Sequence, residues 1–179
     1  MIATVEELFA VLAACAGFFD SVDPALDEGD PLPVLDHSLQ CAALLGEAGA
    51  DDELVVAGLV HDIGHRLAPH HPAEHGVVGA HAVRGLLGAR VAALVELHVP
   101  AKRYLVTVDP AYRAELSDGS TMSLSRQGGD LSPAERATLE ADPHLEDALF
   151  LRRCDEGAKV VGLAVESLER WRPIVEQLT

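Results

Sequence analysis

A histidine and an aspartate stand side by side within an apolar stretch of the chain, in the segment Leu59–His65 (LVHDIGH). Burying two such polar groups in a helix costs free energy unless each group finds a partner of suitable charge or hydrogen-bonding capacity. His61 and Asp62 therefore need partners from elsewhere in the chain, and the fold has to bring those partners to the same interior point.

Apolar residues recur at helical spacing along almost the whole chain, and few stretches alternate as β-strands do. A length of 179 residues is that of one domain with a sizeable core. The segment Ser132–Glu135 (SPAE) has the N-cap serine, first-turn proline and N3 glutamate typical of a helix start. We therefore predict a single all-α domain over residues 1–179. Helices are expected at about 5–19, 34–47, 52–61, 74–87, 89–97, 102–108, 133–141, 144–158 and 165–178, with a polar turn over 27–33 and a long Gly- and Ser-rich loop over 115–130.

The charge balance limits the partners of the protein. Thirteen basic residues against 29 acidic ones give a formal net charge of −16, which disfavours binding to nucleic acid. An anionic substrate would therefore have to be held by a metal or by a few well-placed Lys and Arg side chains. Aromatic residues make up only 4% of the chain, so a choline-type aromatic cage is not expected. No run of 18 apolar residues predicts a membrane span.

The cysteines and the N-terminal residues bear on the compartment. Cys15, Cys41 and Cys154 are far apart and odd in number, which favours reduced thiols in a cytoplasmic protein over disulfides. Residues 1–19 carry Glu6 and Glu7 and no basic residue, so they do not resemble a signal peptide. The sequence leaves the oligomeric state open.

Six imidazole or carboxylate groups lie in apolar stretches of different expected helices or helix ends. A single buried histidine is more often a hydrogen-bonded core residue, but this explanation fits six such groups poorly. Neighbouring helix residues point about 100° apart, so Asp62 could bridge two metals through its two oxygens while His61 binds one of them. The other four side chains could then be terminal ligands, two for each metal. The six candidates are His37, His61, Asp62, His81, His98 and Asp155.

The order of these residues resembles that of a known superfamily. His37, the HD pair at 61–62 and the late Asp155 resemble the H…HD…D signature of HD domains, and the additional His81 and His98 resemble the subset that binds two metals. The segments DHSLQCAALL, LVHDIGH, HVPAKRYL and SLSRQGG together resemble the mixed-valence di-iron oxygenases of organophosphonate catabolism, relatives of inositol oxygenase that cleave a carbon–phosphorus bond. The resemblance spans about residues 27–159.

This resemblance implies a site and its cofactors. It implies an HD-domain helical bundle around two iron ions, Fe(II) and Fe(III), with O2 as co-substrate. One iron would be bound by His37, His61, Asp62 and Asp155, and the second by Asp62, His81 and His98. The phosphonate would be held by His65, Lys102, Ser123 and Gln127. Without the resemblance, we would interpret His65 as a cation at a helix end and Lys102 as a surface lysine. Ser123 and Gln127 would be interpreted as ordinary loop residues. His70, His71, His75 and His144 are expected to be exposed loop or helix-cap residues without a role.

Two positions depart from the family pattern. Asp27 and Asp30 stand where the oxygenases that act on a 2-amino substrate carry a tyrosine, which occupies an open iron position, and a glutamate, which recognises the amine. Asp30 keeps a negative charge on a shorter side chain, so it could still recognise a cationic substituent of the substrate. A smaller hydroxyphosphonate without an amine is equally compatible with the sequence.

The leading hypothesis is a di-iron oxygenase that uses O2 to cleave the carbon–phosphorus bond of a 1-hydroxyalkylphosphonate, giving phosphate and a carboxylic acid. The first alternative is a metal-dependent HD phosphohydrolase that acts on a small phosphate ester or nucleotide with the same ligands and without O2. The second is a binding or regulatory module that keeps the metal site only for folding.

Overall fold

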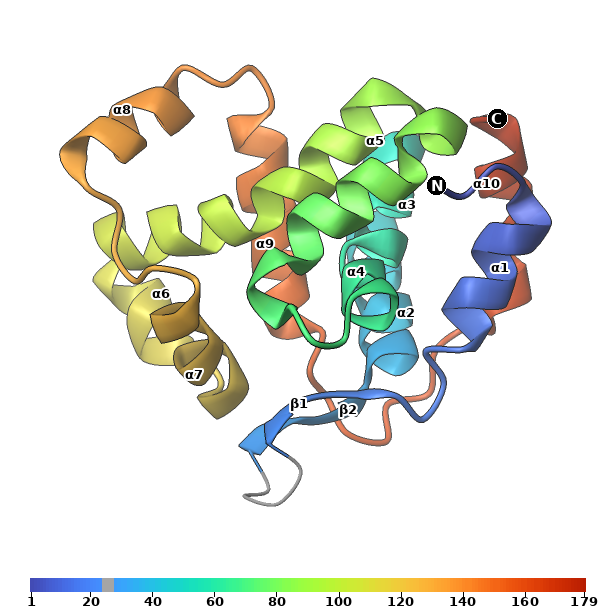
Figure 1. Cartoon of the computed structure of the whole chain (residues 1–179), viewed down its shortest axis with the longest axis horizontal. Coiled ribbons are helices and arrows are strands. Elements are labelled where there is room, and N and C mark those ends of the chain that lie inside the picture. The colour runs from blue at the N-terminus through green and yellow to red at the C-terminus, as the bar shows by residue number, and fades with distance from the viewer. Residues whose placement is uncertain (24–27) are drawn as a thin grey trace.

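Four helices pack against one another at the centre of the fold (Figure 1). They are α2 (Val34–Glu47), α3 (Asp52–Val60), the long α5 (His75–Val108) and α9 (Leu145–Gly157). This computed structural model describes residues 1–23 and 28–179, and the side chains outside 20–31. Aliphatic side chains of the four helices form the main core, among them Leu45, Leu59, Leu94 and Leu151. The expected all-α bundle is confirmed.

Shorter elements cover this centre on several sides (Figure 1). α1 (Val5–Ala13) packs against η2 (Leu168–Trp171) and α10 (Arg172–Gln177), so both ends of the chain lie on one side. On the opposite side the chain forms α6, α7 and α8 between α5 and α9. α4 packs on α5 and also contacts the turn η1. The bounds of these elements are Ile63–Leu67 for α4, Pro72–Glu74 for η1, Pro110–Glu115 for α6, Asp118–Arg126 for α7 and Pro133–Glu140 for α8.

The chain between α1 and α2 differs from the expected helix and turn. α1 ends at Ala13, and Gly17 has a φ of 70°, a conformation that a right-handed helix does not contain. β1 (Phe19–Asp23) and β2 (Glu28–Pro33) then pair as antiparallel strands, with Phe19 opposite Pro33. The prediction of helix up to residue 19 was wrong, and so was that of a turn over 27–33 where the structure describes it, at 28–33.

Two further boundaries were also wrong. The expected loop over 115–130 contains α7, which begins where the Ser117 hydroxyl accepts a hydrogen bond from the Ser120 amide at 3.1 Å. The expected helix over 165–178 begins only at Leu168, with a 3-10 turn before α10. In α7, capping outweighs the helix propensities of the individual residues.

α5 joins three segments that were expected to be separate helices. Its break lies at Gly88, whose φ of 86° and ψ of 178° are not helical. The stretch Pro72–Val108 is long and apolar enough to cross a membrane by length and composition. However, the helix packs against α3, α4 and α9 and buries His98 and Lys102, which is the behaviour of a core helix in a bundle.

Candidate metal centre

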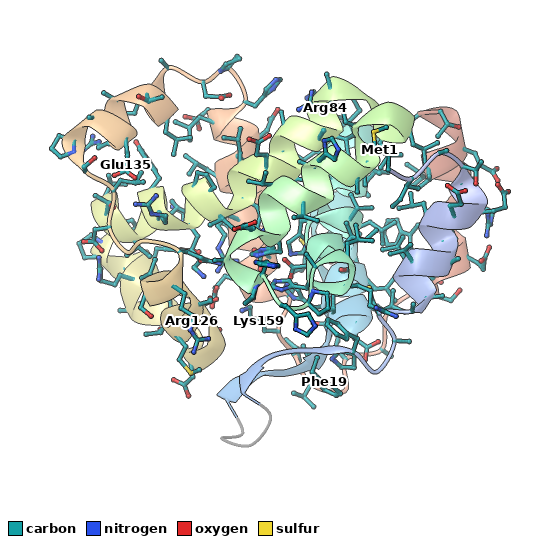
Figure 2. The ribbon with its side chains drawn as sticks, in the orientation of Figure 1. Met1, Phe19, Arg84, Arg126, Glu135 and Lys159 are labelled. Atoms are coloured by element: carbon teal, nitrogen blue, oxygen red, sulfur yellow. The ribbon has the colours of Figure 1, made fainter. Side chains whose placement is uncertain are left out.

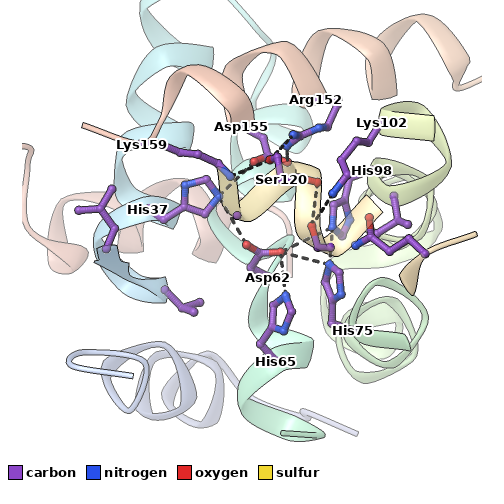
Figure 3. Close-up of a pocket in the computed structure, with 16 residues that line it drawn as sticks. His37, Asp62, His65, His75, His98, Lys102, Ser120, Arg152, Asp155 and Lys159 are labelled. Carbon is purple, nitrogen blue, oxygen red and sulfur yellow. Dashed lines mark hydrogen bonds and ion pairs between the residues drawn. The ribbon is translucent and has the colours of Figure 1, made fainter. Parts of the chain in front are cut away.

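Asp62 lies where α3 ends and α4 begins, at a break in the helical path. Its Oδ2 atom is 3.3 Å from Nε2 of His61 and 3.4 Å from Nε2 of His37. Its Oδ1 atom is 3.4 Å from Nε2 of His75 and 3.5 Å from Nε2 of His98 (Figure 3). The two oxygens of one carboxylate therefore face two different groups of histidines, which is the arrangement that a bridging ligand needs.

Asp155 extends the first of these groups. Its Oδ1 atom lies 3.2 Å from Nε2 of His37, and its Oδ2 atom lies 3.9 Å from Nε2 of His61. His37 comes from α2, His61 from the end of α3 and Asp155 from α9, so the contacts among the central helices bring these groups together. The second group consists of Asp62, His75 and His98, with both of these histidines on α5.

The rings of His37, His61, His75 and His98 share one hydrogen-bonding arrangement. In each ring Nδ1 lies at hydrogen-bond distance from a backbone carbonyl oxygen, which favours the proton on Nδ1 and leaves a lone pair on Nε2. The Nδ1 distances are 2.9 Å for His37 to Ala158, 2.7 Å for His61 to Gly58, 2.6 Å for His75 to Pro72 and 2.6 Å for His98 to Val95.

These lone pairs point at one another. Nε2 of His37 is 3.2 Å from Nε2 of His61, and Nε2 of His75 is 2.8 Å from Nε2 of His98. Two lone pairs at such distances repel unless a proton or a metal cation lies between them. Four imidazole nitrogens and two carboxylates around buried space fit two metal ions of the kind that mixed N/O ligands bind.

The charge states of the two carboxylates and of His98 suit metal binding, whereas His61 would have to lose a proton: although burial lowers the pKa of His61, Asp62 and Asp155 outweigh it and raise that pKa to about 9. Although burial raises the pKa of Asp62, the neighbouring His61, His65 and His75 outweigh it and hold that pKa well below its usual range. The pKa of Asp155 is likewise well below its usual range, because Arg152 and His37 outweigh the effect of burial. Burial, reinforced by His75, lowers the pKa of His98 well below its usual value and so keeps the imidazole neutral. Ionised carboxylates and neutral imidazoles are the forms that bind metals.

Five of the six expected ligands meet in this cluster, but His81 does not. His81 is exposed on α5, and the buried His75, six residues earlier, stands where His81 was expected. At about 100° per residue, six residues place the two side chains on different faces of the helix. The structure therefore corrects two expectations: His81 is a surface residue, and His75 is a candidate ligand.

Glycines explain how His75 reaches the centre. A Cβ atom at Gly64 would lie 1.9 Å from the carbonyl oxygen of His75, so only glycine lets the start of α5 come this close to α4. A Cβ atom at Gly76 would lie 3.3 Å from the His98 ring. The glycines in LVHDIGH and HGVVG could have indicated, from the sequence alone, that two helices approach closely at His75.

A pocket beside the cluster brings together four of the expected substrate contacts, His65, Lys102, Ser123 and Gln127. The Lys102 amine donates a hydrogen bond to the Ser123 hydroxyl at 2.7 Å. The Gln127 Oε1 atom is buried and has no hydrogen-bond partner among the described residues. The His65 ring stacks on the His75 ring, with centroids 3.9 Å apart. Burial lowers the pKa of His65, so the neutral ring is favoured over the protonated one.

The expected roles of Asp27 and Asp30, the two aspartates that depart from the family pattern, stay predictions. Asp27 lies outside the described residues. Asp30 belongs to β2 by its backbone, and its side chain is outside the described part, so its expected contact with substrate stays a prediction.

Sequence reasoning missed two cations of the pocket, Arg152 and Lys159. Arg152 forms an ion pair with Asp155 (Figure 3) and another with Glu156. Lys159 donates hydrogen bonds to the hydroxyls of Ser120 at 2.9 Å and Ser117 at 3.1 Å. Burial, with a further contribution from Arg152, lowers the pKa of Lys102 to about 7, so an anion beside these cations would favour the charged amine. The sequence positions of these cations, Arg152 three residues before Asp155 and Lys159 four residues after it, could have indicated their place beside the cluster.

A helical bundle that buries histidines and aspartates around an HD pair defines a class of metal-binding domains. The chain belongs to the HD domain family, whose sequence profile matches residues 34–155. It is 40% identical over 151 residues to a hydroxymethylphosphonate dioxygenase of Gimesia maris, covering 79% of this chain and 75% of that protein. It is 29% identical over 170 residues to a glycine-betaine-forming [1-hydroxy-2-(trimethylamino)ethyl]phosphonate dioxygenase of Leisingera caerulea, covering 90% and 87% of the two chains.

Proposed function

We propose that the protein is an oxygenase that uses O2 to cleave the carbon–phosphorus bond of a 1-hydroxyalkylphosphonate. The reaction would consume one O2 and give phosphate and a carboxylic acid, so that each product gains one oxygen atom. The observation that carries this proposal is the single carboxylate of Asp62 between two groups of metal-binding side chains, next to a pocket lined by three cations. The names of the two relatives support the same reaction class.

The candidate ligands divide into two sets that share Asp62. His37, His61 and Asp155 would complete the site of one iron, and His75 and His98 that of the other. Two iron ions, when bound, supply the redox chemistry for O2 and act as Lewis acids on oxygen atoms. No protein nucleophile is required.

The remaining residues of the pocket suit a dianionic phosphonate. Lys102, Arg152 and Lys159 provide positive charge in a protein whose net charge is −16, and buried charge-assisted hydrogen bonds are the strong ones. The hydroxyls of Ser120 and Ser123 and the amide of Gln127 add hydrogen-bonding groups. Fixing the phosphonate at this end would orient the carbon that bears the hydroxyl towards the metals.

Replacing Lys102 is expected to weaken substrate capture. Lys102→Met removes one charge-assisted hydrogen bond, worth about 1.5–3 kcal/mol, so kcat/KM should fall about 10- to 150-fold. Arg84→Gln is the matched control, because Arg84 is exposed on the same helix and lies far from Lys159 (Figure 2). Steady-state phosphate release measures both variants, and equal activity of Lys102→Met and the wild type would remove Lys102 from the substrate site.

Oxygen dependence tests the proposed reaction. Protein loaded with iron under anaerobic conditions should release phosphate and a carboxylic acid from a hydroxyalkylphosphonate when O2 is added, in a one-to-one ratio, and release nothing under argon. Phosphate release from phosphate esters under argon with Mn²⁺ or Mg²⁺ would indicate a phosphohydrolase instead. If metal removal melts the fold and neither substrate class is turned over, the metal serves folding only.

A further inference from the structure

The pocket has two chemically different parts. The polar part consists of three cationic side chains, two serine hydroxyls and an amide: Lys102, Arg152, Lys159, Ser120, Ser123 and Gln127. Five of the candidate ligands also line the pocket: His37, Asp62, His75, His98 and Asp155. Apart from His65 and Gly119, the remaining described lining residues are Leu32, Val34 and Val99. Leu32 is 5% exposed and Val34 is 3% exposed, so both side chains are packed rather than free to swing aside.

The position of the apolar part follows from the chain path. Val34 is the first residue of α2 and lies three residues before His37, so the two side chains stand on the same face of the helix. Leu32 precedes it in β2, which leads directly into α2 and also packs on α7. In Figure 3 the chain entering α2 lies beside His37, apart from Lys102. Leu32 and Val34 therefore adjoin the first group of ligands, whereas Val99 directly follows His98 of the second group.

This arrangement determines where a substituent of the substrate would lie. If the phosphonate occupies the polar part and the substrate hydroxyl lies at the metals, a further substituent on the hydroxyl-bearing carbon would contact the apolar part of the pocket. The whole pocket has a volume of only about 60 Å³, so the phosphonate and its substituent would share a small space.

A cationic substituent would be poorly placed in this part. The carboxylates among the described lining residues are Asp62 and Asp155; Asp62 faces five histidines and Asp155 pairs with Arg152. None of the described lining residues is Phe, Tyr or Trp, so no aromatic face is available for a quaternary ammonium group. Burying such a cation against Leu32 and Val34 would cost its hydration without a compensating partner.

We propose that Leu32, with Val34, acts as the specificity-determining wall of the pocket and limits the substituent on the hydroxyl-bearing carbon to hydrogen or a small uncharged group. This inference rests on the proposed function. Hydroxymethylphosphonate, with hydrogen at that position, is then the preferred substrate, and its products are formate and phosphate.

The test compares kcat/KM for substrates of increasing size within one preparation, so that the fraction of active protein cancels in each ratio. The series is hydroxymethyl-, 1-hydroxyethyl- and 1-hydroxypropylphosphonate, followed by the 2-trimethylamino derivative. A tightly fitted apolar wall discriminates about 10- to 200-fold per methylene. We therefore expect kcat/KM to fall at least about tenfold at the first bulky member of the series, and to be lowest for the cation.

Leu32→Ala should widen the pocket and raise the ratio of propyl to hydroxymethyl turnover at least about tenfold. Leu32→Val should move the ratio in the same direction by less. Leu131→Ala is the control, because Leu131 is a similarly buried leucine that packs in a separate cluster with Leu139 and Leu145. Its ratio should match that of the wild type.

The outcomes separate the two proposals. If hydroxymethylphosphonate yields phosphate but Leu32→Ala leaves the ratio of propyl to hydroxymethyl turnover unchanged, the proposed role of Leu32 is overturned. The proposed function then still stands. If the protein turns over the cationic substrate efficiently and Asp30→Asn abolishes that turnover, the inference is overturned and recognition of the cation is assigned to Asp30. No O2-dependent phosphate from any member of the series overturns the proposed function, and this inference with it.

Discussion

Asp62→Asn is expected to abolish activity and to lower the metal content of the protein. The carboxylate faces both groups of candidate ligands, so its loss weakens two metal sites at once. An amide is isosteric but uncharged, and it cannot bridge two cations as a carboxylate does. Metal centres contribute several kcal/mol to catalysis, so we expect kcat/KM to fall at least about 1000-fold. Elemental analysis after desalting should find fewer than two irons per chain.

Asp36→Asn is the control for this experiment. Asp36 directly precedes His37 on α2 but is exposed, so the variant makes the same chemical change without touching the centre. It should keep both metals and its activity within about twofold, as surface substitutions usually do. Two irons per chain in Asp62→Asn, with activity near that of the wild type, would refute the bridging role of Asp62.

The second large effect separates two histidines of one helix. His75→Ala should lose the metal bound by Asp62, His75 and His98, and its kcat/KM should fall at least about 100-fold, because metal chemistry contributes several kcal/mol. His81→Ala should keep both metals and stay within about twofold of the wild type, because His81 is exposed. Metal content and phosphate release, measured together with thermal unfolding, distinguish ligand loss from misfolding. The reverse pattern would restore His81 as the ligand.

Local sequence patterns predicted the elements that depend on local interactions. The helices beginning at Asp52 and Pro133 start as their caps indicate: Asp51 accepts a hydrogen bond from the Leu54 amide at 3.0 Å, and Ser132 with Glu135 forms a capping box. Polar groups in otherwise apolar helices likewise marked His37, His61, Asp62, His98 and Asp155, because a buried polar group requires a partner.

Elements fixed by tertiary contacts could not be predicted in the same way. α7 is rich in Ser, and its start is held by Glu156 of α9, which accepts hydrogen bonds from the Ser117 amide at 2.7 Å and the Ser120 hydroxyl at 2.7 Å. Glu156 lies 39 and 36 residues away from these partners in sequence. The burial of His75 depends in the same way on the close approach of α5 to Gly64. Such contacts have no local periodicity, so the segment preceding His75 resembled a surface loop.

Anomalous diffraction at the iron absorption edge, from crystals of the anaerobically loaded protein, tests the two-metal centre most directly. We predict two iron peaks per chain on opposite sides of the Asp62 carboxylate. One should lie within bonding distance of Nε2 of His37 and His61, and the other within bonding distance of Nε2 of His75 and His98. A single peak, or a metal bound away from Asp62, would contradict this centre.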